Sequence, residues 1–146
     1  MNSVIFVCLG NICRSPIAEG IAKQIVMQRG LHVKVSSAGT GNWHAGEPPC
    51  KNSIEVAHKN GVDISHLRAS QITKKELKEF DVVIALDQSN YNDLKNLGAK
   101  NLYKLGSFGH YNQDVPDPYF FNGFEGFDKV YEMIDSCVTQ MFEELA

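Results

Sequence analysis

Two side chains able to carry out chemistry flank one short segment near the start of the chain. Cys8 and Arg14 are separated by five residues. A cysteine thiolate is a strong nucleophile, and an arginine guanidinium can bind two oxygens of one phosphate group. The pair therefore predicts nucleophilic attack on a phosphate ester.

The segments on either side indicate how this pair would be positioned. Residues 3–7 form a short apolar run rich in β-branched side chains, which predicts a buried strand. From Pro16 the pattern becomes helical, with Ile17, Ile21 and Ile25 one turn apart. A strand, a tight loop and a helix N-terminus direct backbone N–H groups and partial positive charge toward one point. These donors favour both a bound anion and a thiolate at Cys8.

The residue types inside the loop suit that geometry. Gly10 and Asn11 tolerate positive φ, Ser15 can donate a hydrogen bond to the Cys8 sulfur, and Pro16 needs no N–H at the first helical position. We predict that the phosphate-binding residues are Leu9, Gly10, Asn11, Ile12, Cys13, Arg14 and Ser15.

The segment 7–16, VCLGNICRSP, resembles the signature of the low-molecular-weight protein tyrosine phosphatases. A C-x5-R-S sequence occurs in all cysteine phosphatases, but this form at the N-terminus is far more specific. The resemblance continues through SAGT at 37–40, DISH at 63–66 and DPY at 117–119. It implies a Rossmann-like α/β fold with four parallel strands. The length predicts one domain over residues 1–146, and the compact length and the Asp-Pro loop favour a bacterial source.

The rest of the chain alternates predicted strands and helices. Strands are expected at 3–7, 32–37, 81–86 and 100–105, and helices at 16–29, 52–60, 88–97 and 124–145, with a short helix opened by a capping box at 73–76. This alternation favours a three-layer α/β sandwich, a parallel sheet with helices on both faces. Loops after parallel strands open at one edge, so Cys8, residues 37–43, Asp87 and residues 106–123 are expected to share a crevice.

A departing phenolate needs a proton, and Asp117 is the predicted general acid. It lies between two prolines after the fourth predicted strand, which restricts its backbone, and the resemblance implies an acid in such an Asp-Pro loop. Asp114 is the second choice. Trp43, Tyr119 and Phe120 are expected to form apolar walls for an aromatic substrate group.

The resemblance also implies a hydrogen-bond network that supports the phosphate loop, formed by Asn11, Ser15, Ser37 and His66. Cys13 is expected to be a resolving thiol that traps oxidised Cys8 as a disulfide. Cys50 and Cys137 are interpreted as structural, and the remaining histidines, His32, His44, His58 and His110, as surface residues.

Composition limits the partners and the compartment. The 146 residues carry a formal net charge of −3, which argues against nucleic acid or anionic membrane as a partner. The four cysteines have no zinc-site spacing, and the loop and Arg14 are expected to supply the positive charge, so no metal is needed. No cofactor is expected. With no signal-peptide pattern and no apolar stretch of transmembrane length, a reducing cytoplasm is expected. The chain is expected to be a monomer or a weak dimer.

Together these features predict a protein-tyrosine phosphatase that acts through a phosphocysteine on Cys8 and takes phosphotyrosine-containing proteins as substrates. Inorganic phosphate or sulfate is expected as a product-like ligand. One alternative is an arsenate reductase, which would need further thiols near Cys8, and residues 71–111 contain no cysteine. The other is a phosphotyrosine-binding module, which would leave the Cys8, Arg14 and Asp117 combination without a role.

Overall fold

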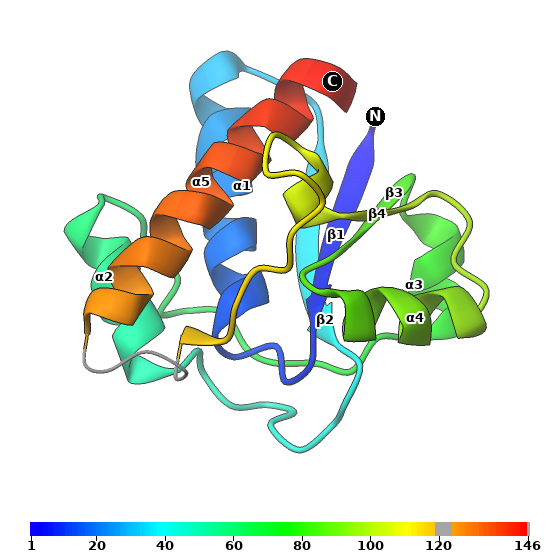
Figure 1. The fold of residues 1–146 in the computed structure, drawn as a ribbon, viewed down its shortest axis with the longest axis horizontal. Helices are drawn as coiled ribbons and strands as arrows, with labels where there is room; N and C mark the ends of the chain where they lie inside the picture. The colour runs from blue at the N-terminus through cyan, green and yellow to red at the C-terminus, as the bar shows by residue number, and fades with distance from the viewer. Residues whose placement is uncertain (119–123, 146) are drawn as a thin grey trace.

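A four-stranded parallel sheet forms the centre of the molecule (Figure 1). The computed structural model describes residues 1–118 and 124–145. The strand order is β2-β1-β3-β4. The strands are β1 (Ser3–Cys8), β2 (Lys34–Gly39), β3 (Val82–Ala85) and β4 (Leu102–Lys104). The predicted three-layer α/β class, with helices on both faces of a parallel sheet, is confirmed.

The helices cover the two faces of this sheet (Figure 1). One face packs against α1 (Arg14–Arg29), α2 (Lys51–Lys59) and α5 (Glu125–Leu145), and the other against α3 (Lys74–Glu79) and α4 (Gln88–Asn96). A short 3₁₀ helix, η1 (Leu105–Ser107), follows β4. Within the described part of the chain, no helix is long and apolar enough to cross a membrane.

The alternation of β1 determines which face Cys8 joins. Val4, Phe6 and Cys8 belong to the core beneath α1 and α5, whereas Ile5 and Val7 point to the core beneath α3 and α4. All six residues of β1 are buried, as a central parallel strand requires. Cys8, the last of them, therefore leaves the sheet on the side where α1 begins.

The second strand differs from its predicted position. It runs over Lys34–Gly39 rather than 32–37, because β1 pairs to its very end, with Val7 opposite Ala38 and Cys8 opposite Gly39. Alanine and glycine have low strand propensity, so the sequence pattern placed them in the following loop. Pairing with the buried central strand outweighs that local preference.

Candidate active site

The loop between β1 and α1 folds back onto the end of β2. The backbone N–H of Thr40 donates to the Cys8 carbonyl and that of Gly41 donates to the Leu9 carbonyl, both at 2.9 Å. A Cβ on Gly39 would lie 2.7 Å from the Leu9 oxygen, closer than real Cβ atoms come to such an atom. Glycine at the end of β2 is therefore needed for the loop to approach this closely.

The Cys8 sulfur has two hydrogen-bonding neighbours within the loop. Ser15 Oγ lies 3.0 Å from Sγ, and the Asn11 backbone N–H donates to Sγ at 3.3 Å. Asn11 Nδ2 also donates to Ser15 Oγ at 2.8 Å, which leaves the Ser15 proton to point at the sulfur. Both donors stabilise negative charge on Cys8, the state in which it is nucleophilic.

Asn11 itself is held in a left-handed conformation, with φ of 57°. Its Nδ2 donates to Ser37 Oγ at 2.9 Å, and its Oδ1 accepts from the Ser70 backbone N–H at 3.0 Å. Ser37 in turn donates to a carboxylate oxygen of buried Glu19 at 2.6 Å. A left-handed non-glycine residue costs free energy, and this network offsets that cost by satisfying both ends of the amide.

His66 does not take the supporting position expected of it. It is exposed and lines a separate cavity of about 220 Å³ with Gly20, Asp63 and others. No hydrogen bond among residues 1–118 and 124–145 joins it to the loop. The network closes instead through Glu19 and the backbone of Ser70, neither of which the sequence analysis selected.

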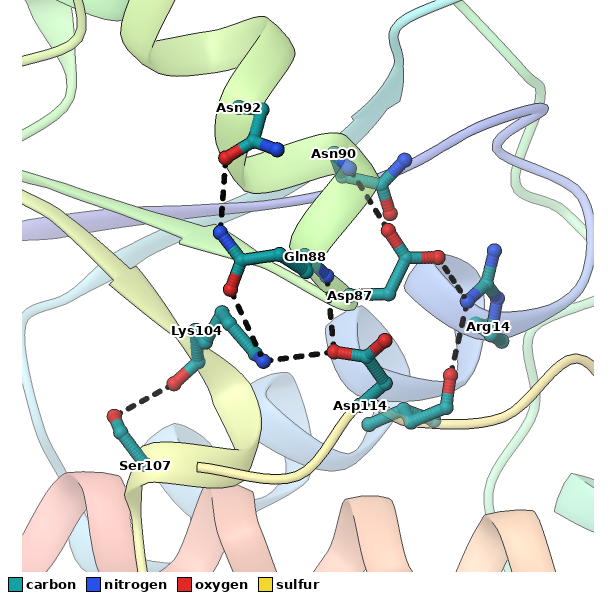
Figure 2. Close-up of polar contacts among 9 residues, drawn as sticks. Arg14, Asp87, Gln88, Asn90, Asn92, Lys104, Ser107 and Asp114 are labelled. Atoms are coloured by element: carbon teal, nitrogen blue, oxygen red, sulfur yellow. Dashed lines mark hydrogen bonds and ion pairs between the residues drawn. The ribbon is translucent and has the colours of Figure 1, made fainter. Parts of the chain in front are cut away.

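The Arg14 side chain is held by two acceptors from other segments of the chain (Figure 2). Its Nη1 donates to Asp87 Oδ2 at 2.7 Å and to the Val115 carbonyl at 2.9 Å. Burial acts to lower the pKa of Arg14, but the negative charges of Cys8 and Asp87 more than offset it, so the pKa lies above its usual value. Asp87 also caps α4, since its Oδ1 accepts from the Asn90 N–H at 2.8 Å. One carboxylate thus orients both the helix and the guanidinium.

The two candidate acids are placed differently. Asp114 Oδ1 is held 2.7 Å from Lys104 Nζ and accepts from the Gln88 N–H at 3.0 Å (Figure 2). Asp117 lines the cavity above Cys8, and Asp114 does not. The geometry therefore favours Asp117, the first choice, over Asp114.

The cavity that contains the sulfur has a volume of about 250 Å³. It is lined by Cys8, Leu9, Gly10, Ile12, Cys13, Arg14, Trp43, His44 and Asp117. Trp43, a predicted wall residue, lines this cavity and is 69% exposed. The other two predicted wall residues, Tyr119 and Phe120, lie outside the described residues.

His44 and Asp87 have more specific places than the sequence indicated. His44, interpreted as a surface residue, lines the cavity, and its Nδ1 donates to a carboxylate oxygen of Glu47 at 2.9 Å. A Cβ on Gly10 would lie 3.0 Å from the His44 ring. Asp87 lies two positions after the end of β3, so its place at the sheet edge was predictable, but its ion pair with Arg14 was not. Glu19 is one carboxylate in a helix, and nothing in the sequence pattern distinguishes it.

The positive charge of the site comes from Arg14 and from backbone N–H groups. Within residues 1–118 and 124–145, no cluster of three histidine, cysteine or acidic side chains is arranged to hold a metal ion. The cavity thus combines a thiol, a loop that ends in an arginine, and a carboxyl group, an arrangement that could carry out phosphoryl transfer through a covalent intermediate.

The chain is similar in sequence to known phosphatases. Residues 3–146 match the family model described as low molecular weight phosphotyrosine protein phosphatase. The low molecular weight protein-tyrosine-phosphatase PtpA of Staphylococcus aureus is 41% identical over 98% of this chain and 93% of its own length.

Solved structures give the same result. The low molecular weight protein tyrosine phosphatase of T. tengcongensis superposes with a TM-score of 0.92 at 32% identity, covering 99% of this chain and 100% of that one. A protein tyrosine phosphatase from Entamoeba histolytica, with Hepes in its active site, superposes with a TM-score of 0.91 at 28% identity, covering 99% and 97%.

Proposed function

The chain belongs to the low molecular weight phosphotyrosine protein phosphatase family and is a phosphatase, and from this premise we propose that it hydrolyses phosphotyrosine in proteins, and small aryl phosphates, through a phosphocysteine on Cys8. Arg14 binds the phosphate, and Asp117 is the general acid and base. The observation that carries the proposal is the single cavity lined by Cys8, Arg14 and Asp117, which brings the two ends of one loop together with a residue about a hundred positions further along the chain.

In the first step the Cys8 sulfur attacks phosphorus in line with the departing phenol oxygen. The N–H groups of residues 9–15 and the Arg14 guanidinium bind the equatorial oxygens, where charge accumulates in the transition state. Because Asp87 and Val115 fix Arg14 in advance, it needs little reorganisation as the reaction proceeds. Ser15 and the Asn11 N–H stabilise the sulfur, both as a thiolate before attack and as the leaving group later.

Asp117 acts twice in this scheme. It first protonates the phenol oxygen as the ester bond breaks, and as a carboxylate it then accepts a proton from the water that attacks the phosphocysteine. Its place on the wall of the cavity supports both steps. Trp43 provides an apolar surface beside the phenyl ring of the substrate.

The physiological partners are proteins that carry phosphotyrosine, and inorganic phosphate or sulfate would occupy the loop as product-like ligands. We propose that residues 1–146 act as one domain and that the protein works in the cytoplasm, where a catalytic thiol stays reduced. The proposal includes neither a nucleic-acid partner nor a membrane partner.

Hydrolysis of p-nitrophenyl phosphate with EDTA present tests the proposal. We expect turnover by the wild type and none by the Cys8→Ser variant, with inorganic phosphate as a competitive inhibitor. A wild type that binds phosphate but does not turn over would make the loop a receptor. Turnover that survives Cys8→Ser would assign the nucleophile elsewhere.

A further inference from the structure

A second thiol pair lies directly beside the phosphate-binding loop. Cys13 Sγ donates a hydrogen bond to Cys50 Sγ, and the two sulfur atoms are 2.7 Å apart. That is within about 1 Å of the S–S bond length of a disulfide, about 2.05 Å. Cys50 lies at the N-terminus of α2, 37 positions after Cys13, and was interpreted from the sequence as structural.

The backbone holds this pair together independently of the two thiols. The Cys50 N–H donates to the Ile12 carbonyl at 2.7 Å, and Ser53 Oγ donates to the Cys13 carbonyl at 3.0 Å. Ser53 is fully buried. The start of α2 is therefore attached to the phosphate loop at two consecutive residues, which keeps both sulfurs in register without a covalent bond.

The surroundings give the two thiols different characters. The hydrogen bond to Cys50, followed by burial, raises the pKa of Cys13, so Cys13 keeps its proton. Cys50 accepts that hydrogen bond, and it lies at the N-terminus of a nine-residue helix. Both features favour negative charge on the Cys50 sulfur, the form that attacks a disulfide.

We propose that Cys50 is a second resolving thiol, which takes over a disulfide from the nucleophile, so that oxidation by a hydroperoxide ends in a Cys13–Cys50 disulfide and leaves Cys8 reduced. The inference rests on the proposed role of Cys8 as the reactive thiolate. Cys13 is the connecting residue, because it lines the cavity of Cys8 and also contacts Cys50.

The chemistry balances in three steps. The Cys8 thiolate attacks the hydroperoxide, whose O–O bond breaks, and forms a sulfenic acid while an alcohol or water departs. Cys13 attacks the Cys8 sulfur, and the hydroxyl leaves with the Cys13 proton as water. Cys50 then attacks Cys13 Sγ, the Cys8–Cys13 bond breaks, and Cys8 leaves as a thiolate. In sum, one hydroperoxide is reduced and the two thiols Cys13 and Cys50 are oxidised.

The last exchange is favoured by the groups that serve catalysis. Ser15 and the Asn11 N–H stabilise Cys8 as a thiolate, which makes it the better leaving group of the two sulfurs bonded to each other. A Cys13–Cys50 disulfide leaves the hydrogen bonds to Cys8 in place, and its two sulfur atoms are already in contact. The relay would restore a working nucleophile, where a single resolving thiol would leave it blocked.

The test is oxidation of the full chain with one equivalent of hydrogen peroxide, followed by p-nitrophenyl phosphate hydrolysis and mass-spectrometric mapping of disulfides. We expect the wild type to keep most of its activity and to contain Cys13–Cys50. The Cys50→Ser variant should match wild type before oxidation, lose most of its activity afterwards as Cys8–Cys13, and recover it with dithiothreitol. Serine is a good helix N-cap, so α2 should remain intact.

The control is Cys137→Ala, which removes a buried thiol from α5 and should behave as wild type. A wild type that loses activity as fully as Cys50→Ser, or whose only disulfide is Cys8–Cys13, would overturn the proposal. Failure of the proposed function would be seen separately, as absence of turnover in both proteins before any peroxide is added.

Discussion

Arg14 shows how one residue acquires a fixed role from its acceptors. A guanidinium on a long side chain has many rotamers, and binding a phosphate would normally freeze them at the cost of entropy. Here Nη1 already contacts Asp87 and the Val115 carbonyl, and the side chain is largely buried. The rotamer is therefore selected before substrate arrives, and the remaining donors of the fork are available for phosphate oxygens.

Asp87→Asn separates this orienting role from helix capping. Asparagine caps helices about as well as aspartate, so α4 should persist while the charge that aligns Arg14 is lost. A hydrogen bond to a charged group contributes about 1.5–3 kcal/mol, so kcat/KM should fall about 10- to 100-fold. The melting temperature should also fall, because the largely buried Arg14 loses its carboxylate partner while α4 keeps its N-cap. Steady-state kinetics and thermal unfolding measure the two effects. Asp93→Asn, on the exposed face of α4, is the matched control, and an equal fall in that variant would contradict the assignment.

Among single residues, those whose chemistry follows from their type could be predicted from the sequence. Those whose role depends on a hydrogen-bond partner elsewhere in the chain could not. Cys8, Arg14 and Asp117 were selected, and they line one cavity. Glu19, Ser70 and Cys50 were not, because a helical glutamate, a loop N–H and a distant thiol acquire their roles only through contacts made by the fold.

Among the elements, the end of β2 determines the shape of the phosphate loop. Gly39 pairs with Cys8 and touches the Leu9 carbonyl, so β2 is both a strand and the surface on which the loop rests. The shift of this strand relative to its predicted bounds is therefore part of how the site is built. Strand propensity is a local property, and the pairing that extends β2 comes from the whole length of β1.

Gly39→Ala tests that contact. Its φ is not in the left-handed region, so the methyl group acts through its clash with the Leu9 oxygen and the adjoining backbone of Gly10 and Asn11. Overpacking of this kind costs about 1–3 kcal/mol, and relief of the clash should displace the loop and lower kcat. Ser36→Ala on the same strand should change neither kcat nor thermal stability appreciably. Normal kinetics in Gly39→Ala would mean that the loop does not depend on this approach.

The predicted capping box at the start of α3 is present. Thr73 Oγ1 accepts from the Glu76 N–H, and Glu76 accepts from the Thr73 N–H, both at 3.1 Å. The Thr73→Ala variant should lose about 1 kcal/mol of unfolding free energy, read from the denaturant midpoint, with kcat unaffected because α3 lies away from the cavity. Thr73→Ser keeps the hydroxyl and should restore stability. A short motif like this was predictable because it is complete within four residues.

For the molecule as a whole, two buried groups on α5 make the free energy of unfolding depend on pH in the alkaline range. Burial raises the pKa of Cys137 from near 9 to about 12 and, with Asp135 as a lesser cause, that of Tyr131 from near 10 to about 12. Both groups stay neutral in the folded state at a pH where they ionise in the unfolded chain.

Their contribution to stability is therefore complete below pH 9 and is lost as the pH rises toward about 12. Urea unfolding at a series of pH values should show this decline, and Tyr131→Phe should make the decline shallower. A Tyr131→Phe variant with the same slope as wild type would contradict the assignment of that residue.

The most direct test of the mechanism is rapid-quench detection of the covalent intermediate. In Asp117→Asn, a good leaving group such as p-nitrophenol should still depart, while activation of water is lost, so phosphocysteine should accumulate. We predict a burst of p-nitrophenol and a phosphoryl group mapped to the Cys8 peptide, with neither in the Cys8→Ser, Asp117→Asn double variant. A phosphoryl group on another residue, or steady turnover without any phosphoenzyme when hydrolysis is slowed, would contradict nucleophilic catalysis by Cys8.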